Sequence, residues 1–320
     1  MIVAVGRLAT ALLLLLSVPA WGQQGEKPDP ASSAFTDQVS VGYVLVPVIV
    51  RSLRGGYAMH LQQKDFQLKI DGRTVRIESF ETRAEAPASV IFLQDLSGSM
   101  ATGGHLAQSR AIVRYFLDHA LPGDEFAIAS FASGAQRIEV PFTPDLGALR
   151  TDIGRWQPYG VTALHDAVAW LPQISLAGRN PKRFAILVTD GVDNASTITP
   201  EQAREIVRAA QLPVYVLGLG SGDPYALLPG GQKTYRYADV LNLLAYETGG
   251  RYYPLSGAED MQKALAAIAD DLRHEYVLGF ATGEGKARNR EIEVDVGGRN
   301  RSVLFRHGYK GPPPNGVAGG

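Results

Sequence analysis

Apolar and polar residues alternate along this chain in two ways, which divide it into three parts. Up to about residue 85 the pattern is strand-like: apolar residues alternate from Phe66 to Ile70, and Asp71-Gly72 is a strong hairpin signal. Between residues 86 and 272, short apolar runs alternate with segments of helical period. Strands that alternate with helices predict a mostly parallel, doubly wound, Rossmann-like α/β sheet, covered on both faces. After residue 272 the pattern is strand-like again.

The two β-rich ends are predicted to form one domain. Neither has enough strands for its own core, because an isolated hairpin is only marginally stable in water, whereas together they offer about six strands. We therefore predict a small β-sandwich whose halves are residues 38–85 and 273–310. The α/β domain, residues 86–272, is inserted between these halves. Pro47, within the first strand-like run, predicts an edge strand or a bulge there.

The start of the chain has the pattern of an export signal. Arg7 precedes the apolar run of residues 12–16, the run breaks at Pro19, and the small residues Ala20 and Gly22 give a plausible cleavage point. This is typical of a signal peptide, here residues 1–22, and the run is too short to span a bilayer. The alternative is an uncleaved N-terminal anchor. We expect an exported protein, secreted or periplasmic, with no membrane insertion once the signal is removed.

Composition narrows the classes of partner. The chain has 31 Lys and Arg against 32 Asp and Glu and shows no basic face, which argues against nucleic acid as a partner. A nearly neutral surface also argues against strong electrostatic capture by membranes. With no cysteine, neither a disulfide nor a lipid-attachment site is available. The polar, Pro-rich residues 23–37 predict a linker, and residues 311–320 a disordered tail.

Three separated segments place oxygen-bearing side chains at predicted strand ends. Asp95, Ser97 and Ser99 follow one buried-strand pattern, Thr162 lies in a Gly-Val-Thr segment, and Asp190 follows another strand pattern. In an open α/β sheet, loops at the carboxyl ends of parallel strands meet along one edge, where ligands bind. Two carboxylates and three hydroxyls there would form an oxygen-only site, which suits Mg²⁺, with Mn²⁺ as a substitute.

The order and types of these five residues resemble the metal-ion-dependent adhesion site (MIDAS) of the von Willebrand factor A-type (VWA) domain. That site has the motif Asp-x-Ser-x-Ser, then a threonine, then an aspartate. The resemblance implies that Ser97, Ser99 and Thr162 coordinate Mg²⁺ through neutral hydroxyls, while Asp95 and Asp190 act partly through water. The ion then keeps an open position, which an Asp or Glu carboxylate of a protein partner completes.

A wider resemblance links the ends of the chain to exported bacterial VWA-related proteins. Those proteins carry an Asp-Phe…Asp-Gly segment upstream of the metal domain. They also share a Tyr-x-Leu-Gly-Phe strand and an Arg-x-Gly-Tyr close, matched here at residues 276–280 and 306–309. The resemblance therefore covers residues 38 to 310 or so.

Five further residues are predicted to support the site. Gly98 and Gly160 let the backbone turn tightly around an ion, and Gly191 follows the distal aspartate. His165, three residues after the threonine, is the only histidine that the sequence places near the motif. We expect His165 to pack in the first turn of the following helix or to support the site indirectly, rather than to act as a general base. Asp166 is expected to accept hydrogen bonds in a loop rather than to bind metal.

These patterns favour protein recognition without catalysis, with cell adhesion as the biological class. One alternative is an exported hydrolase that uses the same ion as a Lewis acid. Another is an envelope scaffold in which the metal is structural. A positioned base beside the ion would favour the hydrolase, and His165 is the residue available for it. Without any metal, the two serines would cap the following helix and Asp190 would lie in a strand-end turn.

Overall fold

The computed structural model describes residues 42–83, 86–191, 193–210, 212–220 and 237–315. The expected signal peptide and linker lie outside these residues. Among the described helices, none is both long enough and apolar enough to cross a membrane.

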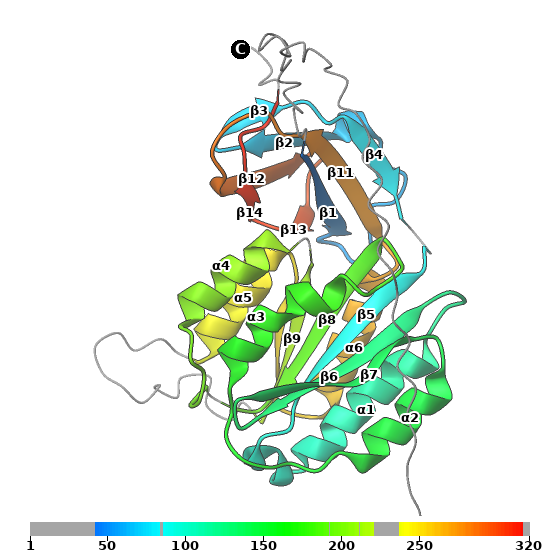
Figure 1. The fold of residues 1–320 in the computed structure, drawn as a ribbon. Helices are drawn as coiled ribbons and strands as arrows, with labels where there is room; N and C mark the ends of the chain where they lie inside the picture. Colours follow the sequence, from blue (N-terminus) through cyan, green and yellow to red (C-terminus); the bar gives the residue numbers. More distant parts are fainter. Residues whose placement is uncertain (1–41, 84–85, 192, 211, 221–236, 316–320) are drawn as a thin grey trace, which may run out of the picture. The chain divides into compact units, whose positions relative to one another are not determined.

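A six-stranded sheet forms the centre of the α/β part (Figure 1). β5 (Ala88–Asp95) lies in its middle, between β8 (Lys182–Thr189) and β6 (Glu125–Ala132), and every residue of β5 is buried. Burial on both faces explains why these strands are continuous apolar runs in the sequence. Neighbouring strands in this sheet are parallel except β6 and β7. The outer strands are β9 (Val214–Leu219) and β10 (Tyr252–Leu255) beyond β8, and β7 (Ala135–Thr143) beyond β6.

Helices cover both faces of this sheet, as Figure 1 shows. Each face has its own apolar core, which confirms the predicted doubly wound arrangement. One face carries α1 (His105–Asp118), α2 (Leu146–Arg155) and α6 (Ala258–Asp271). The other carries α3 (Leu164–Ser175), α4 (Pro200–Ala209) and α5 (Tyr237–Thr248).

Local sequence signals fix several helix ends. Thr199 caps α4 by accepting a hydrogen bond from the Gln202 N–H, and the Gln202 side chain accepts from the Thr199 N–H. After α5, Gly249 takes a left-handed conformation with φ 84°, which ends that helix. Helix α2 was not predicted. Its main signal is Asp145, whose side chain accepts hydrogen bonds from two backbone N–H groups of the first turn.

The described segments before and after the α/β part form two four-stranded sheets, and each sheet contains strands from both segments. This confirms the predicted insertion of the α/β part into a β-sandwich. One sheet has the order β13 (Arg301–Phe305), β1 (Tyr43–Ser52), β11 (Glu275–Ala281), β4 (Ser79–Thr82). The other has the order β14 (Gly308–Gly311), β12 (Arg288–Val296), β2 (Phe66–Ile70), β3 (Arg73–Val75).

The alternating pattern from Phe66 to Ile70 forms the predicted strand, with its apolar residues facing the core. Phe66, Leu68 and Ile70 are buried in the sandwich core, and the polar residues between them are not. Asp71 and Gly72, with φ values of 50° and 75°, make the turn to β3. Two left-handed residues are what a two-residue hairpin of this kind requires.

Two expectations for the sandwich are corrected. β1 is an interior strand, although Pro47 predicted an edge strand or a bulge. β13 pairs with β1 only from Val48 onward, so Pro47 lies at a local edge on that side. The expected tail was to begin at Gly311, but Gly311 lies in β14, and the Asn315 N–H donates to the Ala281 carbonyl. Residues 316–320 of that tail lie outside the described residues.

A buried carboxylate joins the sandwich to the α/β part. Asp271, the last residue of α6, is fully buried and accepts hydrogen bonds from Arg51 Nε (2.9 Å), the Tyr57 hydroxyl (2.8 Å) and the Tyr215 hydroxyl (3.2 Å). A second Arg51 nitrogen, Nη2, lies 2.6 Å from Asp271 Oδ2. Burial raises the pKa of Asp271, and Arg51 acts against that rise. The carboxylate therefore depends on partners from both parts.

Replacing Arg51 by Met should lower the free energy of unfolding by about 3 kcal/mol, because it leaves a buried carboxylate without its cation. Urea denaturation at neutral pH measures this. The control is Lys69→Met, which breaks the exposed ion pair with Asp295 and should cost far less. Equal losses in the two variants would contradict the importance assigned to the buried pair.

A second junction contact involves a histidine, His307. The His307 ring, after β13, stacks on Tyr246 of α5 at 3.8 Å between ring centres. Burial, with a contribution from Arg208, lowers the pKa of His307 to about 4. Between pH 6.5 and 4 the unfolded chain therefore takes up a proton that the folded protein does not.

The free energy of unfolding should accordingly fall as pH drops from 6.5 to 4, because His307 gains a proton in the unfolded chain but not in the folded protein. Above pH 6.5 the ring is neutral in both states, and the stability that the neutral ring contributes is fully present. We expect the free energy of unfolding to fall by about 1 kcal/mol over this range, because the ring is partly exposed and water screens the effect. The His307→Phe variant keeps a ring for the stack and should lose this part of the pH dependence. Identical slopes for the two proteins in urea denaturation would refute the assignment.

Candidate functional site

Asp95, at the carboxyl end of the central strand β5, is fully buried. Its carboxylate accepts hydrogen bonds from the Ser97 N–H (2.8 Å) and the Thr189 hydroxyl (2.6 Å). Burial raises the pKa of Asp95 to about 6, and these hydrogen bonds act against the rise. The position therefore holds a carboxyl group whose charge is poorly solvated.

The two serines and Asp190 meet at the same edge. Ser97 Oγ lies 3.1 Å from Ser99 Oγ, and the Ser99 hydroxyl donates to Asp190 Oδ1 at 2.7 Å. Ser99 belongs to the short 3₁₀ turn at Gly98–Ala101 that follows β5, while Asp190 follows β8. Because β5 and β8 are neighbouring parallel strands, the two loops start side by side.

Thr162 reaches this edge from the loop before α3. Asn194 holds its backbone on both sides: the Thr162 N–H donates to Asn194 Oδ1 (2.9 Å), and the Asn194 N–H donates to the Thr162 carbonyl (3.0 Å). A β-carbon placed on Gly191 would lie 3.1 Å from Thr162 Oγ1 and 3.6 Å from Ser99 Oγ. Both hydroxyls therefore border the glycine that follows Asp190. The structure thus brings together all five candidate ligand residues, Asp95, Ser97, Ser99, Thr162 and Asp190.

This donor set fits a divalent cation. The Asp190 side chain is 1% exposed, and Asp95 is equally buried. Within the described residues, no lysine or arginine forms an ion pair with either carboxylate. Buried carboxylates without a cation are costly, so a bound ion would supply the missing charge. The described part of the chain holds no group of three or more His, Asp or Glu side chains arranged for a metal, which leaves this mixed hydroxyl and carboxylate set as the candidate.

The predicted glycines hold the loops close together. The Gly98 N–H donates to the Gly160 carbonyl at 3.0 Å, and a β-carbon on Gly98 would lie 3.1 Å from that oxygen. Gly160 has φ 67°, and a β-carbon there would overlap Ser133 Oγ. Gly98 suits its position because another backbone approaches closely, and Gly160 suits its own because of the left-handed φ and the Ser133 side chain.

His165 and Asp166 brace a neighbouring loop. His165 Nδ1 lies 3.2 Å from Asp193, which also accepts the His165 N–H. Burial lowers the pKa of His165, and Asp193 acts against that shift. Asp166 accepts hydrogen bonds from the backbone and hydroxyl of Thr197, as expected of a loop acceptor. In the described contacts, neither side chain touches a candidate ligand residue.

His105 is the residue that the sequence interpretation missed. Its Nδ1 lies 2.6 Å from Asp190 Oδ2, so the statement that His165 is the only histidine near the motif is wrong. His105 is the first residue of α1. A topological signal was available: α1 follows the loop of β5, and Asp190 follows β8, the strand next to β5.

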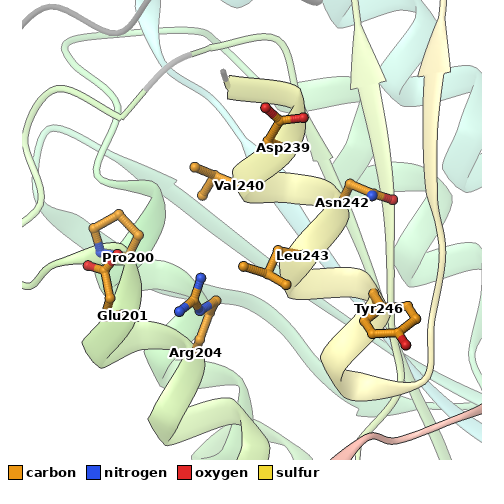
Figure 2. A pocket seen from close by; sticks show the side chains of 8 residues that line it. All are labelled: Pro200, Glu201, Arg204, Asp239, Val240, Asn242, Leu243 and Tyr246. Carbon is orange, nitrogen blue, oxygen red and sulfur yellow. The ribbon is translucent and has the colours of Figure 1, made fainter. Parts of the chain in front are cut away.

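A separate groove of about 510 Å³ lies between α4 and α5 (Figure 2). In Figure 2, Glu201 and Arg204 project from one helix, and Leu243 and Tyr246 from the other. None of the residues that line this groove is a candidate ligand residue.

Residues 90–192 match the sequence model of the von Willebrand factor type A domain, and this segment contains all five candidate ligand residues. An uncharacterized protein of Borreliella burgdorferi is 22% identical over 233 residues, which cover 66% of this chain and 62% of that protein. This chain therefore spans less than two thirds of that relative.

Solved structures with a similar arrangement include a von Willebrand factor type A protein from Catenulispora acidiphila. It is 14% identical, with 79% of this chain and 75% of that chain covered and a TM-score of 0.49. An aerotolerance-related membrane protein from Bacteroides fragilis is 20% identical, with 58% and 98% covered and a TM-score of 0.46. The vWF domain of the type V pili tip protein Mfa5 from Porphyromonas gingivalis is 22% identical, with 33% and 38% covered and a TM-score of 0.30.

Proposed function

We propose that this protein is an exported, non-enzymatic protein-binding module of the adhesion type. It holds one Mg²⁺, or Mn²⁺ in its place, with Asp95, Ser97, Ser99, Thr162 and Asp190. An Asp or Glu carboxylate of a partner protein completes the coordination. The proposal rests mainly on the convergence of these five side chains around two buried carboxylates that have no lysine or arginine partner among the described residues.

The ligand types explain why such an ion would attract a partner. A Mg²⁺ surrounded by many carboxylates would carry a net negative charge and repel another one. Two carboxylates and three neutral hydroxyls leave no excess of negative charge, so the ion favours an incoming carboxylate. The match of residues 90–192 to the von Willebrand factor type A domain supports the same chemistry.

The contacts of the nearby histidines favour binding over hydrolysis. A hydrolase would need a base ready to take a proton from a water on the ion. His105 Nδ1 contacts Asp190 and its Nε2 faces the backbones of Gly103 and Gly220, while His165 contacts Asp193, so neither ring presents a base to the candidate ligand residues. Export is inferred from the N-terminal pattern of residues 1–22.

Calorimetric titration of the chelator-treated protein should show one site for Mg²⁺ and for Mn²⁺. Asp95→Ala should abolish binding, because it removes the buried carboxylate at the strand end. Thr162→Ala or Asp190→Ala should weaken it by about 10–100-fold. Asp118→Ala, which removes an exposed carboxylate paired with Arg150, is the control and should bind normally. The absence of any heat signal at millimolar metal would refute the proposed ion.

Partner binding should depend on the ion. Immobilised protein should retain at least one envelope or extracellular protein in the presence of Mg²⁺ and release it in EDTA. The Asp95→Ala protein should not retain it under either condition. A partner captured equally well by wild type in EDTA, or by the Asp95→Ala protein, would show that recognition does not use this site.

A further inference from the structure

We propose that His105 is a positioning residue that sets the orientation of the Asp190 carboxylate for metal binding. The inference rests on the proposed metal site and adds a residue outside the candidate ligand set.

The Asp190 carboxylate has a separate partner for each oxygen. Oδ2 lies 2.6 Å from His105 Nδ1, and Oδ1 accepts the Ser99 hydroxyl at 2.7 Å. The side chain is 1% exposed, so water does not compete for these positions. With one oxygen held by the imidazole, the carboxylate plane is fixed and Oδ1 is kept on the side of the serine hydroxyls.

Two loops leave space for the imidazole. Gly103 and Gly220 have φ values of 59° and 58°, and they come from the loop after β5 and the end of β9. A β-carbon on Gly103 would lie 2.8 Å from His105 Nε2, and one on Gly220 would overlap the ring. Both backbones are thus shaped around the ring.

The contacts of His165 and His105 differ in one respect. His165 contacts Asp193, which is not a candidate ligand residue. His105 alone of the two contacts a carboxylate of the candidate set. Residues that hydrogen-bond a metal ligand without touching the ion commonly affect metal affinity, because they fix the ligand's orientation before the ion binds.

The test uses the full chain with Mn²⁺ as the probe and compares His105→Ala, His105→Asn and His119→Ala. Calorimetry gives the Mn²⁺ affinity, and the electron paramagnetic resonance spectrum reports the symmetry of the bound ion. His105→Ala should lose about 10–100-fold in affinity and change the spectrum. His105→Asn places an amide N–H near the position of Nδ1 and should recover most of both. The control is His119, the C-cap residue of the same helix, whose ring hydrogen-bonds the Tyr115 carbonyl and stacks on the Tyr115 ring.

A second pair of variants tests the ring's position without removing the ring. Gly220→Ala should displace the imidazole and weaken Mn²⁺ binding. Gly72→Ala imposes the same left-handed strain, with φ 75° and open space around the new methyl group, and should leave affinity unchanged. Thermal unfolding of the metal-free proteins shows whether each variant is folded.

The outcomes separate this inference from the proposed function. If wild type binds Mn²⁺ and His105→Ala binds it equally well with the same spectrum, the inference is overturned and the metal site stands. If His105→Asn and His105→Ala lose the same affinity and unfold at the same lowered temperature, the role of His105 is structural and the inference again fails. If wild type binds no Mn²⁺, both proposals fall.

Discussion

The position of one carboxylate at the end of a completely buried strand governs the candidate site. β5 lies between two parallel strands, and helices cover both faces of the sheet. Asp95, at the end of β5, therefore has no access to water. A charge in such a place must be compensated, and among the described residues Asp95 accepts hydrogen bonds from Ser97 and Thr189 without an ion pair to lysine or arginine. The raised pKa of Asp95 is the thermodynamic sign of this incomplete compensation. Binding a cation would remove the deficit.

The surrounding loops are held mainly by backbone contacts. Gly98 bonds to Gly160 and Thr162 to Asn194, so the segments that carry the hydroxyls are tied to each other before any ion is present. Such a site loses little conformational freedom when it binds, which favours affinity. The same preorganisation explains why glycine is needed where the backbones touch.

Sequence patterns predicted the structural features that depend on residues close in sequence or on the burial of a whole strand or helix. The buried strands, the Asp71-Gly72 hairpin and the Thr199 cap are of this kind. Helix α2 was missed because glycines within it weaken its helical signal, and β14 because a four-residue strand exists only through its pairing with β12. The five candidate ligand residues could be named from their order. The partner of Asp190 could not, because His105 reaches it only through the packing of two loops.

The insertion of the α/β part also bears on the order of folding. β4 pairs with β11 across about 190 intervening residues, and the Arg83 N–H donates to the Glu275 carbonyl at 2.8 Å where the two connections meet. In an unfolded chain, closing a loop of that length costs about 5 kcal/mol. Once the inserted sheet has formed, its two ends already lie side by side and most of this cost disappears. We therefore expect the sandwich to assemble after the insert, and until then its strands would present unpaired edges to other chains during synthesis.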